Sequence, residues 1–324
     1  VANQGIKAGA EIRPFREAVS WSGCLNFLGA ALRTHTQPGV GLWDPDRGAV
    51  TPPDHYGQLS AALALLLLDD HGDGVWRQPL DAWLALGKGQ LGHLPFNRFL
   101  LLLLRDVLSR RGAHEEDLAR ITQGLARCVL KKRYPSNNWS LLAQLCRVIE
   151  ATPAQRPEQV KRFCRLLDRW MTPAGGFIDF PARPQRGGAT PMTYHHKALF
   201  LATTAAWFQD DAALTLRIER LLDWVGLCWD GDGYVGGFGR STHALFGDGC
   251  LLASLTLLGL AEDREDRSGW PVMVDGILRR LQSQRREDGF YGLNPARAEG
   301  RCGWDGYMAL SVYNAWFAAV LAWA

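Results

Sequence analysis

Six short loops rich in glycine, proline and aromatic residues recur along this chain at intervals of 37 to 61 residues. Each interval is long enough for one pair of helices. A helical pair leaves an apolar face that only a neighbouring pair can cover, so a chain built this way must stack its units side by side. The six loops read GVGLWDP, GQLGHLPFN, YPSNNW, AGGFIDFP, GYVGGFGRS and DGFYGLNP.

Helical periodicity dominates the sequence between these loops, with apolar residues at i, i+3, i+4 and i+7. Strand signals are poor, since the only extended-looking pieces (176–180 and 234–238) are short and lie beside glycines. The pattern predicts an all-α fold, an (α/α)6 toroid of six helical hairpins whose loops converge on one end, as a single domain spanning 1–324. An open helical array is the alternative. The expected helices are 58–68, 96–109, 118–130, 139–150, 158–171, 196–207, 212–227, 244–260, 271–284 and 307–322.

Composition excludes several classes of function. Hydrophobic residues make up 47% of the chain and charged residues 21%, as in a globular protein with a sizeable core. The net charge of +3 is too weak for a nucleic-acid footprint. The longest apolar stretches, 61–68 and 99–104, fall far short of the ~20 residues that a membrane span needs.

Cysteine usage bears on the compartment. Seven cysteines are an odd number, and they lack the spacing of a disulfide framework or a metal site. A reducing compartment fits best, so we expect a cytoplasmic protein; a periplasmic one stays open if a signal peptide precedes Val1. We expect no metal and no cofactor, and the sequence does not indicate an oligomeric state.

The segment Tyr194-His195-His196 begins a predicted helix and is the strongest candidate for catalysis. Imidazoles titrate near neutral pH, and a phenol can donate or accept a proton. The peptide N–H groups of a helix start favour developing negative charge nearby. Because neighbouring histidines point in different directions on a helix, we expect one of the two to reach the cleft.

Ser136-Asn137-Asn138-Trp139 leads into another predicted helix. A serine or asparagine there is first of all a helix cap, a role that we assign to Ser136 or Asn137. Asn138 then remains for catalysis, while Asn137 and Trp139 are candidates for substrate binding, since an indole beside an amide suits a sugar.

A third segment holds Arg240 and His243, ahead of the helix at 244–260. A guanidinium binds carboxylates in a bidentate fashion, so we expect Arg240 to be catalytic and His243 to contact substrate. Aromatic residues of the converging loops complete the expected binding site: Trp43, Phe238, Trp304 and Tyr307.

The succession NNW, then GGFIDFP…TPMTYHH, then GYVGGFGRSTHALFG resembles the toroid domain of polysaccharide lyases of the heparinase II/III and alginate lyase kind. The resemblance covers about 134–314. It implies that Asn138 occupies the amide position of those enzymes, that Tyr194 with His195 or His196 occupies the Tyr-His position, and that Arg240 with His243 occupies a later cationic position. Those lyases usually carry a β-sandwich after the toroid, whereas this chain ends with its last predicted helix.

The resemblance implies β-elimination on a uronate-containing oligo- or polysaccharide. A base removes the proton next to the carboxylate, whose charge must first be neutralised by groups such as Asn138 or Arg240. A neutral histidine or an ionised Tyr194 could be the base, and Tyr194 could protonate the leaving oxygen.

Three other functions remain open. An isoprenoid cyclase would use the many aromatic residues to line an apolar, cation-stabilising cavity. A non-catalytic glycan-binding toroid would keep only the aromatic stacking. A hydrolase would need two acidic loop residues, for which Asp44, Asp179, Asp230 and Asp305 are available.

Overall fold

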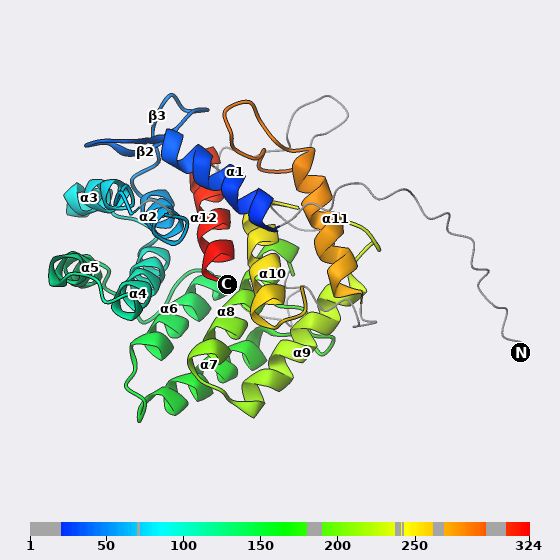
Figure 1. The fold of residues 1–324 in the computed structure, drawn as a ribbon. Helices are drawn as coiled ribbons and strands as arrows, with labels where there is room; N and C mark the ends of the chain where they lie inside the picture. The colour runs from blue at the N-terminus through cyan, green and yellow to red at the C-terminus, as the bar shows by residue number, and fades with distance from the viewer. Residues whose placement is uncertain are drawn as a thin grey trace, which may run out of the picture.

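The protein is an (α/α)6 toroid, as the sequence predicts. The computed structural model describes residues 21–69, 72–179, 190–236, 241, 243–261, 269–295 and 309–324. Within these ranges six helices form an inner ring and six lie outside it; Figure 1 shows the arrangement. The inner helices are α2 (Gly57–Leu67), α4 (Leu94–Arg110), α6 (Asn137–Glu150), α8 (Met192–Phe208), α10 (Leu245–Leu257) and α12 (Leu310–Trp323). The outer helices are α1 (Trp21–Thr34), α3 (Arg77–Ala85), α5 (Glu115–Arg127), α7 (Arg156–Trp170), α9 (Ala212–Leu227) and α11 (Trp270–Gln282).

The inner ring is closed. Each inner helix packs on the inner helices before and after it, and α12 packs on α2. The sequence explains which helices lie inside. Nearly every residue of α8, α10 and α12 is buried, whereas α5 and α7 bury one apolar stripe and expose charged residues on the other face. Because the ring closes, the open helical array is excluded.

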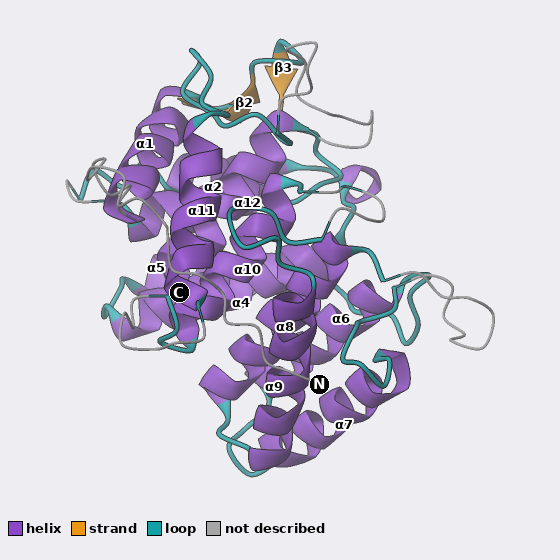
Figure 2. Ribbon diagram, turned by 90° about the vertical axis from the view of Figure 1, so that its right-hand side faces the viewer, coloured by secondary structure: helices purple, strands orange, loops and turns teal. Residues whose placement is uncertain are grey.

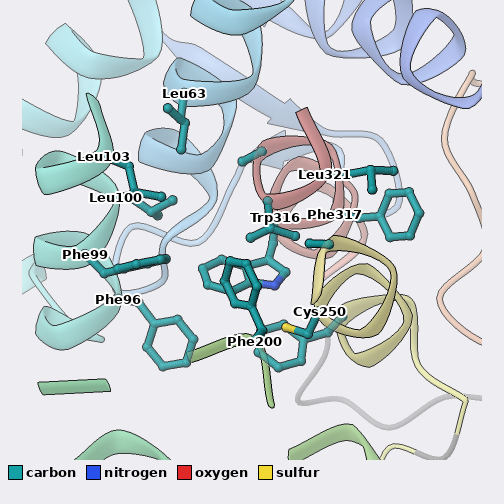
Figure 3. Close-up of a cluster of buried hydrophobic side chains, with 14 of the residues drawn as sticks. Leu63, Phe96, Phe99, Leu100, Leu103, Phe200, Cys250, Trp316, Phe317 and Leu321 are labelled. Atoms are coloured by element: carbon teal, nitrogen blue, oxygen red, sulfur yellow. The ribbon is translucent and has the colours of Figure 1, made fainter. Parts of the chain in front are cut away.

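Aromatic side chains fill the centre of the ring. The Trp316 indole on α12 lies against the rings of Phe96, Phe99 and Phe200, with ring centroids 5.6 to 6.4 Å apart (Figure 3). Trp316, Phe99 and Phe200 are fully buried. The interior below the ring's loop end is therefore a packed core.

Four of the loops between an outer and an inner helix share one turn, in which a backbone bridge joins residues six apart. In the loop before α2, Trp43 N–H donates to His35 O, and in the loop before α8, Ile178 N–H donates to Trp170 O. In both loops the donor directly follows one bridged residue and the acceptor directly precedes the other. In one copy Gly175 has φ +93°, and a Cβ there would lie 2.0 Å from the carbonyl oxygen of Arg220. The bridged pairs are Thr36–Leu42, Met171–Phe177, Trp229–Val235 and Arg285–Tyr291.

The structure corrects two details of the sequence analysis. Helices α1 and α3 were not expected, since α1 follows an undistinguished N-terminal stretch and α3 is short. Three short strands were also missed: β1 (Thr36–Gln37), β2 (Gly41–Asp44) and β3 (Ala49–Val50) pair in an antiparallel sheet. Figure 2 shows that helices form the body of the molecule and that β2 and β3 lie at its margin. In the part of the chain that the structure describes, no helix is both long and apolar enough to cross a bilayer.

Candidate active site

A small pocket lies where the N-terminal ends of the inner helices meet. All six inner units contribute to its lining, so the closed ring is what assembles it. The lining is aromatic and polar: Tyr56 before α2, His93 and Phe96 at the start of α4, Asn138 and Trp139 on α6, Thr193 and Tyr194 on α8, Ser241 and Phe246 before and on α10, and Tyr313 on α12.

Stacked rings form one wall of the pocket. Tyr56 lies parallel to Phe96 at 4.4 Å, and Trp139 meets Phe96 edge to face at 5.8 Å. On the other side Phe246 lies 5.6 Å from Tyr313. Rigid aromatic faces beside phenol groups suit the alternating apolar and polar surfaces of a sugar ring.

His93 lines the pocket and was not singled out from the sequence. It occupies the N-cap position of α4 with φ +43°, a left-handed conformation that is costly for a residue with a Cβ. Its Nδ1 lies 2.7 Å from Asp54 O. A carbonyl can only accept, so Nδ1 carries the proton and Nε2 carries the lone pair.

The surroundings of His93 keep its ring neutral. The pKa of His93 is lowered to about 4, chiefly by burial and in smaller part by the nearby His55 and Lys197. The His55 ring stacks on it at 4.4 Å, and the Trp139 ring lies 4.9 Å away. His93 is therefore a proton acceptor at any pH above about 5.

Asn138 is held at the floor of the pocket by a buried hydrogen-bond network. Asp179 Oδ1 accepts from both the backbone N–H of Asn138, at 2.9 Å, and its Nδ2, at 2.8 Å. Asn138 Nδ2 also lies 3.2 Å from Ser136 Oγ, and Lys197 Nζ donates to Asn138 Oδ1 at 2.7 Å. Asp179 thus caps α6 from the next loop, which is the role expected of Ser136 or Asn137. Asn137 instead donates to Ile178 O at 2.7 Å and holds that loop in place.

Of the Tyr194-His195-His196 segment, Tyr194 alone lines the pocket. His195 is fully buried and turned toward α9. Its Nδ1 accepts from Phe177 N–H at 3.1 Å and its Nε2 donates to Leu221 O at 3.0 Å. Burial lowers the pKa of His195 to about 4, so the ring is a neutral link between a loop and a helix.

His196 is buried against α10, where it is hydrogen-bonded to the backbone of Gly247. Burial lowers its pKa well below the usual value, and His195 adds to the effect. His196 is not among the residues that line the pocket.

The other predicted site residues lie apart from the pocket or outside the described residues. His243 has φ +51° and packs edge to face on Tyr234 at 5.0 Å. Trp43 lies on β2, paired with Val50. Neither lines the pocket. Arg240, Phe238, Trp304 and Tyr307 lie outside the described residues.

Three of the four acidic residues considered for hydrolysis have structural hydrogen bonds. Asp44 Oδ2 accepts from the backbone N–H of Ser311 at 2.9 Å, and so caps α12 as Asp179 caps α6. Asp230 Oδ1 accepts from two N–H groups of its own turn. Asp305 lies outside the described residues. Among the described residues no carboxylate lines the pocket, and no group of three or more His, Cys, Asp or Glu side chains could hold a metal ion.

Comparison with known proteins finds likeness in structure only. No protein-family profile matches the chain, and no curated protein sequence matches it. Among solved structures, a polysaccharide lyase superposes with a TM-score of 0.58 at 11% identity, over 93% of this chain and 96% of the lyase. An unsaturated glucuronyl hydrolase specific for heparin gives 0.61 at 12% identity, over 93% and 94%. An inactive variant of an α-1,6-mannanase from Salegentibacter sp. HEL1_6, in complex with α-1,6-mannotriose, gives 0.61 at 11% identity, over 94% and 98%. These proteins are glycan-processing enzymes that share the α/α toroid fold with this chain.

Proposed function

We propose that the protein is a lyase that cleaves a uronate-containing oligo- or polysaccharide by β-elimination. The observation that carries the proposal is the composition of the pocket, which brings an imidazole, phenols and an amide together between aromatic faces. These are the groups that abstract a weakly acidic carbon-bound proton and stabilise the resulting charge. The glycan-active structural neighbours support a sugar substrate.

The structure supports a role for each group. His93 Nε2 is the general base that takes the proton next to the carboxylate, because its Nδ1 is held by Asp54 O and the ring stays neutral. Tyr194 protonates the leaving oxygen. Asn138 faces the uronate carboxylate. In the complex an oxygen of that carboxylate takes the place of Ser136 Oγ, which lies 3.2 Å from Asn138 Nδ2. Trp139 is the stacking face for the sugar.

This proposal moves the base from the predicted His195 or His196 to His93. Both ring nitrogens of His195 are bonded to backbone groups, so it has no lone pair to offer. The contributions expected of Arg240 and His243 to carboxylate binding stay predictions.

Two observations favour elimination over hydrolysis and over cyclisation. A hydrolase with paired carboxylates needs two acids at the substrate, and no described carboxylate lines the pocket. A cyclase needs an enclosed apolar cavity, and the centre of this ring is filled by Trp316 and its aromatic neighbours.

The test is incubation with a panel of uronate oligosaccharides, following both the ultraviolet absorbance of an unsaturated product and the appearance of new reducing ends. Elimination produces both signals together. We expect Tyr194→Phe and His93→Gln to lower kcat by at least about 100-fold, the usual contribution of a general acid or base. Tyr291→Phe is the matched control, since it removes a buried phenol that does not line the pocket and should leave the rate unchanged.

The alternatives give different results. New reducing ends without absorbance would identify a hydrolase and overturn the proposal. Binding without either product would indicate a glycan-binding protein, and turnover of a prenyl substrate a cyclase. Loss of activity on Tyr291→Phe as well as on Tyr194→Phe would remove the case for a specific role of Tyr194.

A further inference from the structure

Lys197 is a fully buried lysine at the edge of the pocket. It lies on α8, three residues after Tyr194, and so on the same face of the helix. Lysines are almost never fully buried without a partner, because removing an ammonium from water is costly. A buried lysine beside a pocket therefore needs an explanation.

Its amine is directed at two residues of the pocket lining. Nζ donates to Asn138 Oδ1 at 2.7 Å, and it lies 3.8 Å from the centre of the Phe96 ring, within the range of a cation–π contact. Since Asp179 Oδ1 accepts from Nδ2 of the same amide at 2.8 Å, Lys197 and Asp179 hold Asn138 from its two ends. The amide is thereby fixed with its oxygen toward the amine and its nitrogen toward the carboxylate.

Lys197 Nζ forms no direct ion pair with a described carboxylate, while the buried carboxylate of Asp179 is held on the same Asn138 amide. Burial lowers the pKa of Lys197 to about 7, while Cys250 on α10, Asp179 before α8 and Cys146 on α6 act in the opposite direction. The charge of Lys197 in turn lowers the pKa of His93 at the start of α4. The amine therefore changes between charged and neutral near physiological pH, and an anion in the pocket would favour the charged form.

We propose that Lys197 is a positioning residue that makes the pocket selective for acidic sugars: it fixes the Asn138 amide and places a buried positive charge behind it, which a uronate carboxylate in the pocket balances. The proposal deepens the proposed function, because it names the feature of the substrate that the site recognises. Lys197 acts through Asn138.

The experiment measures binding without turnover. A methyl uronoside has no glycosidic bond at C4 to eliminate, and the corresponding methyl glycoside of the neutral sugar differs from it only in the carboxylate. The dissociation constants of both are measured at pH 6 for the wild type, Lys197→Met and Lys161→Met. Lys161→Met removes the same charge from an exposed position on α7 and is the matched control.

We expect the wild type and Lys161→Met to prefer the uronoside by at least about tenfold, and Lys197→Met to bind both glycosides alike. The preference of the wild type should decrease as pH rises through about 7, because the amine loses its proton, and the profile of Lys197→Met should be flat. If the role of Lys197 were merely structural, Lys197→Met would bind both glycosides more weakly by the same factor. The wild type and the variant would then show the same pH profile.

A folded Lys197→Met that keeps the preference and its pH dependence would overturn the proposal. If the variant does not fold, the wild type alone decides, since a preference that is constant between pH 6 and 9 would also overturn it. A protein that shows the pH-dependent preference but makes no unsaturated product would keep this inference and remove the lyase assignment.

Discussion

His195 and Lys197 lie two residues apart near the start of α8, and of these two only Lys197 contacts the pocket lining. Lys197 points toward α6 and the Asn138 amide, while His195 points toward α9 and links two backbone groups. Both are fully buried, and burial lowers the pKa of each. The histidine forms hydrogen bonds at both nitrogens, whereas the lysine amine donates to one side-chain amide and lies over the Phe96 ring.

The first prediction concerns the cost of the Lys197 charge. The pKa of Lys197 is about 7 in the folded protein against 10.5 for the free side chain. Between these values the unfolded chain holds the proton and the folded one does not. The free energy of unfolding of the wild type should therefore rise with pH in this window, by up to about 1.4 kcal/mol per unit, and should not change with this group below pH 7.

Lys197→Met lacks the titrating amine, so its free energy of unfolding does not change with pH through this group. Its stability relative to the wild type should therefore be highest below pH 7 and should decrease as pH rises toward 10. Denaturant unfolding at pH 6, 7.5 and 9 measures the difference. Lys161→Met should differ from the wild type by the same amount at each pH. A pH-independent difference for Lys197→Met would show that its folded pKa is not lowered.

The second prediction assigns His195 to stability. His195→Ala removes the partner of Phe177 N–H and of Leu221 O, which are both buried, and leaves a cavity. The expected loss is about 3–5 kcal/mol in the free energy of unfolding. His195→Gln, which can still accept and donate, should recover part of it. If His195→Ala were as stable as the wild type but inactive, His195 would have a catalytic role instead.

Among single residues, the sequence indicated those that combine a loop position with a distinctive side chain. Asn138, Trp139 and Tyr194 were singled out in this way and do line the pocket. His93 was missed because one histidine in a glycine-rich loop carries no pattern. Lys197 was missed because a lysine after Tyr-His-His is indistinguishable from a surface lysine until its burial is known.

At the scale of elements, carboxylates from the loops cap inner helices that are neighbours in the ring. Asp179, in the loop before α8, caps α6, and Asp44, in the strand β2 before α2, caps α12. Both follow the shared turn by two residues. The loop spacing could predict the helix starts, but not this capping between units, since Asp44 and Ser311 are 267 residues apart.

The third prediction tests such a cap. Asp44 Oδ2 also accepts from Ser311 Oγ at 2.6 Å, and its Oδ1 accepts from Arg47 N–H at 3.1 Å. Asp44→Ala leaves a buried N–H without its acceptor, so the free energy of unfolding should fall by about 2–4 kcal/mol. Asp44→Asn keeps an acceptor and should cost less. Equal losses for the two variants would mean that shape, rather than the cap, is what Asp44 supplies.

For the whole molecule, the repeat of apolar periodicity and loop composition was enough to predict the closed ring, because six units of this size have few other ways to bury their apolar faces. The outer helices α1 and α3 were harder to predict; α3 has only nine residues and buries only Pro79, Leu80 and Trp83. The packing at the centre of the ring could not be predicted, because it joins side chains from α4, α8 and α12 that no local pattern relates.

That packing is the basis of the last prediction. Trp316 fills the axis of the ring directly beneath the pocket, in contact with Phe96 of the lining (Figure 3). Trp316→Ala should lower the free energy of unfolding by about 3–5 kcal/mol, since the surrounding helices of a closed ring can collapse only partly into the space. An apolar cavity of this kind stays dry and binds small aromatic molecules. Indole should therefore raise the melting temperature of Trp316→Ala and leave that of the wild type unchanged. Wild-type stabilisation by indole would instead mean that the native ring already holds an apolar cavity, which is the arrangement that a cyclase requires.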